Sequence, residues 1–235
     1  MTLGIKKVNI LRSGKVDMFG EGKEGLRSRE EEGFTMERVP YSKLKKGLPG
    51  GKGQHVSAYE TPEGDIVFYQ ALSLELAEAA VRDKGFSGDE FDPDRVRWAK
   101  TGFGWVMNRS DCATAEGQER IVAVRMPKEE YLKLAREGAR AGHSGGSVIG
   151  QWDPDYEPVK GSLKGQRNRS RKTLHLGIRP KRFQKDVEPN ITGVDDVTPM
   201  VEEYREEVMK GGADLHDRLM VPNERKFSLF KRSKK

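Results

Sequence analysis

The feature that most constrains the fold of this chain is an abrupt change of pattern between residues 66 and 85. Ile66 to Ala71 form an almost continuous apolar and aromatic run, which is typical of a buried strand. Directly after it, Ser73 is an N-cap residue, apolar residues recur at helical spacing, and Gly85 is placed to end the helix. The sequence therefore predicts a domain that combines strands with helices.

Further strand and helix patterns follow along the chain. More strands are predicted at residues 121–126, 148–152 and 172–179, the last from the alternation in KTLHLGIR. More helices are predicted at residues 128–138 and 198–209, the second with Thr198 as its cap and Pro199 at its first helical position. The sequence WDPDY, which begins at the last residue of the strand at 148–152, indicates turn chemistry. We expect an α+β fold, with a mixed or antiparallel sheet and flanking helices in a single domain.

The N-terminal part of the chain differs from the rest in composition. Residues 13–54 are rich in Gly, Lys, Arg and Glu and have few apolar positions with a strand or helix period. Apolar residues make up only 34% of the chain, which suggests that one part contributes little to the core. We predict a polar extension over 1–54, in which 1–11 can supply one strand, a domain over 55–230 and a basic tail over 231–235.

Cysteine content and hydropathy limit the cellular compartment that we expect for the protein. The single cysteine, Cys112, excludes an intramolecular disulfide and a paired-cysteine redox motif. No apolar stretch approaches the ~18 residues of a membrane span, and the first residues lack a signal-peptide core. We therefore expect a cytoplasmic protein with no membrane partner. In a eukaryote the terminal KRSKK would also suit a nuclear address, although a solvated tail is the simpler explanation.

The basic balance of the chain favours an anionic partner. The formal net charge is +6, and an excess of cations is typical of proteins that bind RNA, nucleotides or acidic surfaces. A merely solvated basic surface would give the same charge. The partner that we expect, RNA or a nucleotide, therefore depends on where the cations lie.

One stretch, from Arg95 to Ser110, mixes cations with aromatic residues. It contains Arg95, Arg97, Lys100 and Arg109 together with Trp98, Phe103 and Trp105. Such a mixture suits a site that holds phosphates while an aromatic ring stacks on a base. The alternative is that the rings fill the core while the cations extend to water.

A second basic stretch runs from Lys160 to Lys185 and contains no acidic residue. It predicts a positive surface for phosphate, or alternatively a mobile basic loop that leads into a strand. His175 lies in that strand between apolar neighbours and is a candidate acid or base, although a single strand histidine is more often structural. Motifs for a P-loop, a dinucleotide-binding turn, a zinc site or a nucleotidyl-lysine are absent, and we predict no bound metal.

Taken together, these motifs resemble the DUF4291 family, whose function is unknown, between about Ala58 and Phe227. The resemblance rests on Arg95-x-x-Trp98-x-Lys100-x-x-Phe103-x-Trp105-x-Met107-x-Arg109-Ser110, Gln118, Gln151-Trp152-Asp153-Pro154, Gly177, Arg179, Asp196-Val197-Thr198 and Pro222-x-Glu224-Arg225. Where the family carries Arg-x-x-Gln before the glycine segment, this chain has Lys172 and His175, so the resemblance assigns no role to His175. It also has Ser57 where the family carries Arg.

The segment FYQALSLELAEAAVRDKGF is similar, more loosely, to the start of ADP-ribosyltransferase-like folds. That similarity implies a cleft around Tyr69, Gln70, Lys100 and Arg109, suited to NAD or to an RNA phosphate. Fold analogy does not fix an activity.

Three hypotheses for function follow. The first is an RNA-binding enzyme, an RNA ligase or end-processing transferase, that holds phosphate with Arg97, Lys100, Arg109 and Arg179 and needs neither ATP nor another cofactor. Either His175 or Lys100 would move the proton. The second is an NAD-dependent ADP-ribosyltransferase in which Trp98 or Trp105 stacks on a ring and Gln118 or Glu224 steadies the transition state. The third is a non-enzymatic RNA- or nucleotide-binding module.

The residues predicted for the site fall into two groups. The predicted catalytic residues are Lys100, His175 and Arg109. The predicted phosphate- or nucleic-acid-binding residues are Arg95, Arg97, Tyr69, Gln70, Trp98, Trp105, Gln151, Lys172 and Arg179.

Overall fold

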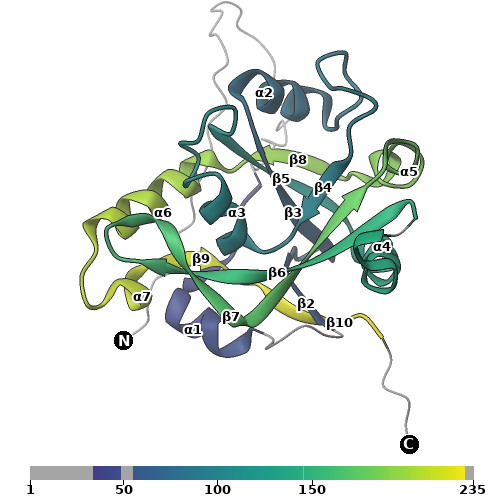
Figure 1. Cartoon of the computed structure of the whole chain (residues 1–235). Helices are drawn as coiled ribbons and strands as arrows, with labels where there is room; N and C mark the ends of the chain where they lie inside the picture. Colours follow the sequence, from purple (N-terminus) through teal and green to yellow (C-terminus); the bar gives the residue numbers. More distant parts are fainter. Residues whose placement is uncertain (1–33, 49–54, 145, 231–235) are drawn as a thin grey trace, which may run out of the picture.

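An eight-stranded sheet forms the centre of the fold, and within the described residues all of its strand pairs are antiparallel. The computed structural model describes residues 34–48, 55–144 and 146–230 (Figure 1). The strands are β2 (His55–Glu60), β3 (Asp65–Leu72), β4 (Arg97–Lys100), β5 (Arg120–Pro127), β6 (Val148–Val159), β7 (Ser162–Ile178), β8 (Gly193–Asp196) and β10 (Arg225–Ser228). Their order is β10-β2-β3-β4-β7-β6, and β5 lies between β3 and β8. The predicted α+β class is confirmed.

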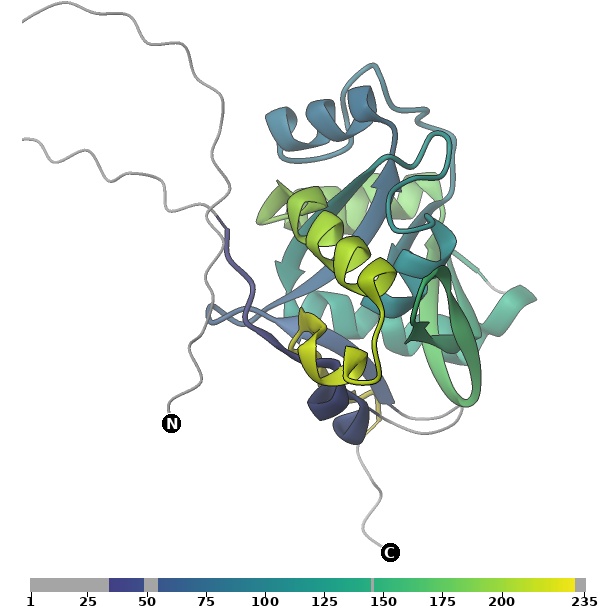
Figure 2. The ribbon, with the colours of Figure 1, turned by 90° about the vertical axis from the view of Figure 1, so that its left-hand side faces the viewer.

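Helices cover both faces of this sheet. They are α1 (Tyr41–Gly47), α2 (Leu74–Asp83), α3 (Phe103–Arg109), α4 (Lys128–Ala141), α5 (Pro180–Asp186), α6 (Thr198–Lys210) and α7 (Leu215–Arg218), with 3-10 turns at Gly142–Ser144 and Glu188–Asn190. One hydrophobic core packs α2, α4 and α5 against the sheet, and a second packs α1, α3, α6 and α7 (Figures 1 and 2). In β3, Ile66 and Phe68 belong to the first core while Val67 and Tyr69 belong to the second. Burial on both faces explains why this strand has an almost continuous apolar sequence.

Part of the predicted N-terminal extension packs onto the domain. β1 (Arg38–Pro40) pairs with β9 (Met220–Pro222) in a separate two-stranded sheet, and α1 follows it. Val39, Tyr41 and Leu44 are buried in the second core. The strand predicted within residues 1–11 and the basic tail at 231–235 lie outside the described residues.

The ends of the helices follow the predicted signals with two differences. Ser73 caps α2, and its hydroxyl accepts a hydrogen bond from the backbone N–H of Leu76 at 3.5 Å. The chain leaves that helix at Lys84, which has a left-handed conformation with φ of 52°, one residue before Gly85. Thr198 is the first residue of α6 and not its cap, because its hydroxyl accepts the backbone N–H of Ile121 at 2.9 Å and so joins the helix to β5.

The long hairpin of β6 and β7 corrects two sequence predictions. β6 continues through the predicted turn at WDPDY to Val159, and residues 162–171 form the first part of β7, where a mobile loop was one alternative. Proline normally disrupts a strand interior, but Pro154 lies at a bulge, which is one of the places where a sheet tolerates it. The hairpin therefore extends the predicted strands by many residues.

The helices of the described ranges are short or polar. None of them combines the length and the apolar character that a helix needs to cross a membrane.

Candidate functional site

A cavity of about 440 Å³ opens on the second-core face of the sheet, where β4, β6 and β7 meet α3. Its lining is dominated by polar, cationic and aromatic side chains. The lining residues are Trp98, Lys100, Trp105, Arg109, Gln118, Gln151, Asp153, Pro154, Tyr156, Arg167 and His175. This volume falls in the range of small-molecule sites.

Strand alternation explains how the floor of the cavity is assembled. Side chains two residues apart share a face of a strand, so Trp98 and Lys100 point to the same side of β4. Lys100 pairs with His175 of β7, and His175 pairs with Gln151 of β6. Three strands thus place Lys100, His175 and Gln151 in one row across the sheet.

Helix α3 supplies the wall above this floor. It begins at Phe103, directly after β4, and its residues Trp105 and Arg109 are four apart and therefore lie on one helical face. The Lys100 ammonium lies 5.2 Å from the centre of a Trp105 ring, and the Arg109 guanidinium carbon lies 5.6 Å from it. Both cations therefore gather around one indole.

Lys100 is a cation without an acidic partner. Within the described part of the chain its ammonium makes no ion pair or hydrogen bond. Burial, together with the positive charges of Arg109 and Arg95, lowers its pKa to about 8. A buried amine that is repelled by two neighbouring cations is well placed to bind an anion and to exchange a proton near neutral pH.

His175 is buried with its polar atoms unused. Its ring centre lies 4.0 Å from that of Trp105, and the residue is only 1% exposed. Neither ring nitrogen has a hydrogen-bond partner, and Nε2 lies 3.9 Å from the nearest Asp153 carboxylate oxygen. Burial, aided by the charge of Lys100, lowers its pKa to about 3. The neutral ring can therefore offer one donor and one acceptor to a ligand.

Asp153 is the single carboxylate among the residues that line the cavity. The Gln151 amide Nε2 donates to both of its oxygens at 2.9 Å, which fixes the orientation of the carboxylate. A fixed carboxylate can accept hydrogen bonds from ligand hydroxyls. The cavity thus offers three cations for phosphate and one acceptor for hydroxyl groups.

Gly177 makes room for Trp98. A Cβ atom at position 177 would lie 3.1 to 3.3 Å from three carbons of the indole. The ring therefore lies directly over the β7 backbone, which only glycine permits without a shift of Trp98. This contact explains the presence of glycine in the sequence motif.

A family comparison covers all of these residues. The sequence pattern of a family described as "Domain of unknown function (DUF4291)" matches residues 55–227. The chain belongs to the DUF4291 family. The resemblance seen in the sequence is confirmed, and the matched range contains the whole cavity lining but neither β1 nor α1. A comparison with curated proteins found no match.

Several residues that the sequence singled out lie away from the cavity of this DUF4291 domain. Arg97 points to the opposite face, where its guanidinium carbon lies 5.1 to 5.5 Å from the rings of Phe86, Phe91 and Phe183. Tyr69 is fully buried in the second core, and Gln70, also buried, points to the other face of β3. Neither lines the cavity.

The remaining predicted cations do not line the cavity either. Arg179 is exposed, and its Nε donates to the backbone oxygen of Gly146 at 2.9 Å. Lys172 lines a smaller neighbouring cavity of about 20 Å³. Arg95 is exposed but close enough to Lys100 to lower its pKa.

Sequence reasoning gave no individual site role to four residues that line the DUF4291 cavity, namely Asp153, Pro154, Tyr156 and Arg167. Asp153 could have been found, because it lies two residues after Gln151 and therefore shares its face of the strand. Tyr156 and Arg167 are opposite one another in the part of the β6–β7 hairpin that follows Pro154, and no local pattern indicates that this part reaches the cavity.

Glu224, a candidate in the NAD hypothesis, lies elsewhere. It lines two small cavities together with Asp155, and its carboxylate accepts the backbone N–H of Phe103 at 2.8 Å. Burial raises its pKa to about 8. Gln118, the other candidate, does line the main cavity.

Proposed function

We propose that this DUF4291 domain binds the phosphate-bearing end of an RNA in the cavity and joins or transfers at that end without ATP, as an RNA ligase or end-processing transferase. The observation that carries the proposal is the convergence of Lys100, Arg109 and His175 on one cavity, with no acidic partner for either cation among the described residues. The activity would take place in the cytoplasm and need no cofactor.

The charges and rings support a nucleotide as the ligand. Lys100, Arg109 and Arg167 offer charged donors to phosphate oxygens. Arg109 and Arg167 are exposed, whereas the Lys100 ammonium is partly desolvated and therefore binds an anion more strongly than a solvated cation does. Trp98 and Trp105 offer aromatic faces to a base. Asp153 would accept from a ribose hydroxyl.

The pKa values favour Lys100 over His175 as the group that moves the proton. A base that titrates near neutral pH is effective at both accepting and returning a proton, which suits the Lys100 pKa of about 8. The His175 pKa of about 3 makes its ring a weak base. We therefore assign His175 the task of hydrogen-bonding a ligand hydroxyl or phosphate oxygen.

A joining reaction on a 2′,3′-cyclic phosphate balances without any co-reactant. The 5′-hydroxyl oxygen of one RNA end attacks the cyclic phosphorus, a new P–O5′ bond forms, and the P–O2′ bond breaks. The proton of the 5′-hydroxyl passes to the neutral amine of Lys100, and the resulting ammonium protonates O2′. Arg109 would stabilise the additional negative charge on the phosphoryl oxygens.

The test is a gel assay of end-labelled RNA with a 2′,3′-cyclic phosphate and a 5′-hydroxyl, with and without NAD. We expect a longer or circular product without NAD, and its loss in Lys100→Met and Arg109→Met. Binding should also weaken with salt, by a log–log slope of about −0.7 for each phosphate neutralised. RNA that binds without giving a product would point to the binding module, and binding that does not respond to salt would contradict the proposal.

One observation favours the NAD-dependent alternative: Gln118 lines the cavity together with Trp98 and Trp105. In an ADP-ribosyltransferase the same cations would hold the two phosphates of NAD. Product only in the NAD lane, together with NAD binding by calorimetry, would select this function. Absence of NAD binding would remove it.

A further inference from the structure

A bulge divides the β6–β7 hairpin into an inner and an outer part. Pro154 pairs with Lys172, but the next residue of β6, Asp155, pairs with Asn168. Residues 169–171 of β7 are therefore extra residues without partners in the ladder. Bulges redirect side chains and are frequent beside functional sites.

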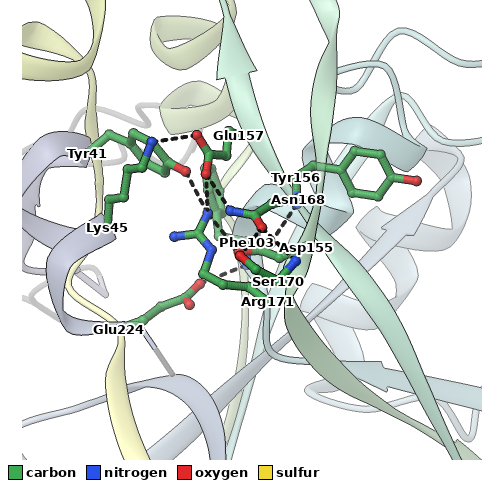
Figure 3. A network of polar contacts seen from close by, with 10 residues as sticks. All are labelled: Tyr41, Lys45, Phe103, Asp155, Tyr156, Glu157, Asn168, Ser170, Arg171 and Glu224. Carbon is green, nitrogen blue, oxygen red and sulfur yellow. Dashed lines mark hydrogen bonds and ion pairs between the residues drawn. The ribbon is translucent and has the colours of Figure 1, made fainter. Parts of the chain in front are cut away.

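The bulge directs the Arg171 side chain into a network of polar and charged groups on one face of the hairpin. Its Nη2 donates to the Tyr41 hydroxyl at 3.0 Å and lies 3.3 Å from Glu157 and 3.4 Å from Asp155 (Figure 3). The Lys45 ammonium contacts Glu157 at 2.6 Å. Arg171 is only 6% exposed.

The two carboxylates that contact Arg171 flank a residue of the cavity. Asp155 and Glu157 lie on one face of β6, so Tyr156 between them lies on the other. Figure 3 shows the Tyr156 side chain pointing away from the network. Tyr156 lines the main cavity together with Arg167, its partner across the hairpin. The outer hairpin thus has the network on one face and a wall of the cavity on the other.

Tyr41 and Lys45 belong to a segment that is anchored elsewhere. β1 pairs with β9, and the backbone N–H of Tyr41 donates to the Leu219 oxygen at 2.8 Å. The Tyr41 ring packs at 5.0 Å, edge to face, on His216 of α7. The outer hairpin therefore contacts, through Arg171, a fixed part of the molecule that lies outside the family match at 55–227.

From this arrangement we propose that Arg171 is a positioning residue of the cavity, through which β1 and α1 hold Tyr156 and Arg167 in the place where they contact the ligand. The proposal rests on the proposed function only in taking the cavity as the ligand site. Its direct consequence is that loss of a contact on the N-terminal segment alters a cavity that this segment does not touch.

The first experiment measures amide hydrogen exchange of the unliganded protein and needs no ligand. Tyr41→Phe removes the hydroxyl that accepts from Arg171, and Lys45→Met removes the contact with Glu157. We expect each to raise exchange of the 155–168 amides severalfold, with about tenfold for the double variant, while the β3–β5 ladder is unchanged.

Two matched variants serve as controls. Tyr59→Phe also removes a tyrosine hydroxyl that binds the N-terminal segment, through the Glu37 backbone N–H at 2.9 Å, but among the described residues this hydroxyl makes no hydrogen bond to the hairpin. Lys133→Met breaks a Lys–Glu pair of the same 2.6 Å length on α4. Neither should raise exchange in residues 155–168.

The second experiment measures binding and turnover of the cyclic-phosphate RNA. Tyr41→Phe should raise KM about fivefold with little change in kcat, because Tyr156 and Arg167 hold the ligand while Lys100 does the chemistry. The proposal is overturned if Tyr41→Phe and Tyr59→Phe give the same exchange, or if exchange rises without a change in KM. If the wild-type protein does not bind this RNA, the proposed function fails, and exchange alone then decides whether Arg171 holds the hairpin.

Discussion

The charges on the two sides of the β6–β7 hairpin differ in whether they are paired. In the network around Arg171, each carboxylate lies within hydrogen-bond or ion-pair distance of a cation. In the cavity, Lys100, Arg109 and Arg167 have no acidic partner among the described residues. Paired buried charges are held in place by the fold, whereas an unpaired charge that is largely removed from water, as in Lys100, lowers stability unless a ligand completes it. Arg109 and Arg167 are exposed and carry no such cost. The comparison supports a structural role for the network and agrees with the proposed binding role of the cavity.

Lys100→Met should give the largest separation between function and stability. Activity on the cyclic-phosphate RNA should fall by about 10²- to 10⁴-fold, since the proposed acid–base group is lost. Stability at pH 7 should rise, because the lowered pKa of about 8 means that burial penalises the ammonium form. The gain should shrink between pH 8 and about 10.4, where the unfolded lysine also loses its proton.

Urea unfolding across this pH range, beside turnover, checks the prediction. Lys128→Met is the matched control, because Lys128 is paired with Glu60 at 2.6 Å. It should lower stability slightly and leave activity unchanged. A Lys100→Met protein that is both active and less stable would remove the distinction between the two regions.

Arg171→Met should produce the largest loss of stability. Removing one partner of a buried charge network costs about 3–5 kcal/mol, because Asp155 loses its cation and Glu157 keeps only Lys45. Urea denaturation at pH 7 measures the loss. Arg82→Met, which breaks exposed pairs with Asp83 and Glu90, should cost far less than Arg171→Met, because water screens exposed pairs. Equal losses would mean that the network is not structural.

Glu224→Gln should change the pH dependence of stability. Burial raises the Glu224 pKa to about 8, so the native state favours the protonated form. Its contribution is complete below the unfolded pKa of about 4.3 and is lost as the pH rises through 8, by up to about 1.4 kcal/mol per pH unit. The glutamine variant should lack this decline. Parallel pH profiles of unfolding free energy for the two proteins would contradict the raised pKa.

His175→Phe should stabilise the protein by about 1 kcal/mol while it reduces activity. The variant removes two buried ring nitrogens that have no partner and retains an aromatic contact with Trp105. Thermal unfolding and turnover measure the two effects. If activity persists, His175 has no contact with the ligand and its burial is merely structural.

Arg97→Met should have the smallest effect. Arg97 lies among three phenylalanine rings on the face opposite the cavity, so its loss should cost about 1 kcal/mol of stability and leave RNA affinity unchanged. Urea unfolding and an RNA titration test this. A loss of affinity would mean that RNA contacts both faces of the sheet.

The sequence predicted the elements that depend on local patterns. β3 and α2 follow from a continuous apolar run and a capping serine, and Lys100, Trp105 and Arg109 come from one short stretch. Arg97 lies three residues before Lys100 on the same strand, so strand parity places it on the opposite face. The number of cations in the stretch does not show on which face of the strand each one lies.

The rest depended on pairing between distant residues. The outer hairpin follows a bulge of three residues, and its contact with α1 joins residues more than a hundred positions apart. No local period indicates such a contact, so Tyr156 and Arg167 could not be assigned to the cavity. The packing of β1 and α1 escaped prediction for the same reason, since each element is short and mostly polar around a few buried side chains.

The pairing of β3 with β4 is limited to a single pair of residues, Tyr69 with Lys100, whereas β3 pairs with β5 along its whole length. β4, and with it the strands β7 and β6 that carry the cavity, therefore joins β3 at the backbone of Lys100, the proposed proton-transfer residue. Lys100 thus joins two parts of the sheet through its backbone, besides its proposed role in proton transfer. Its main chain closes the fold irrespective of its side chain, so the chemistry at this position can change while the architecture stays the same.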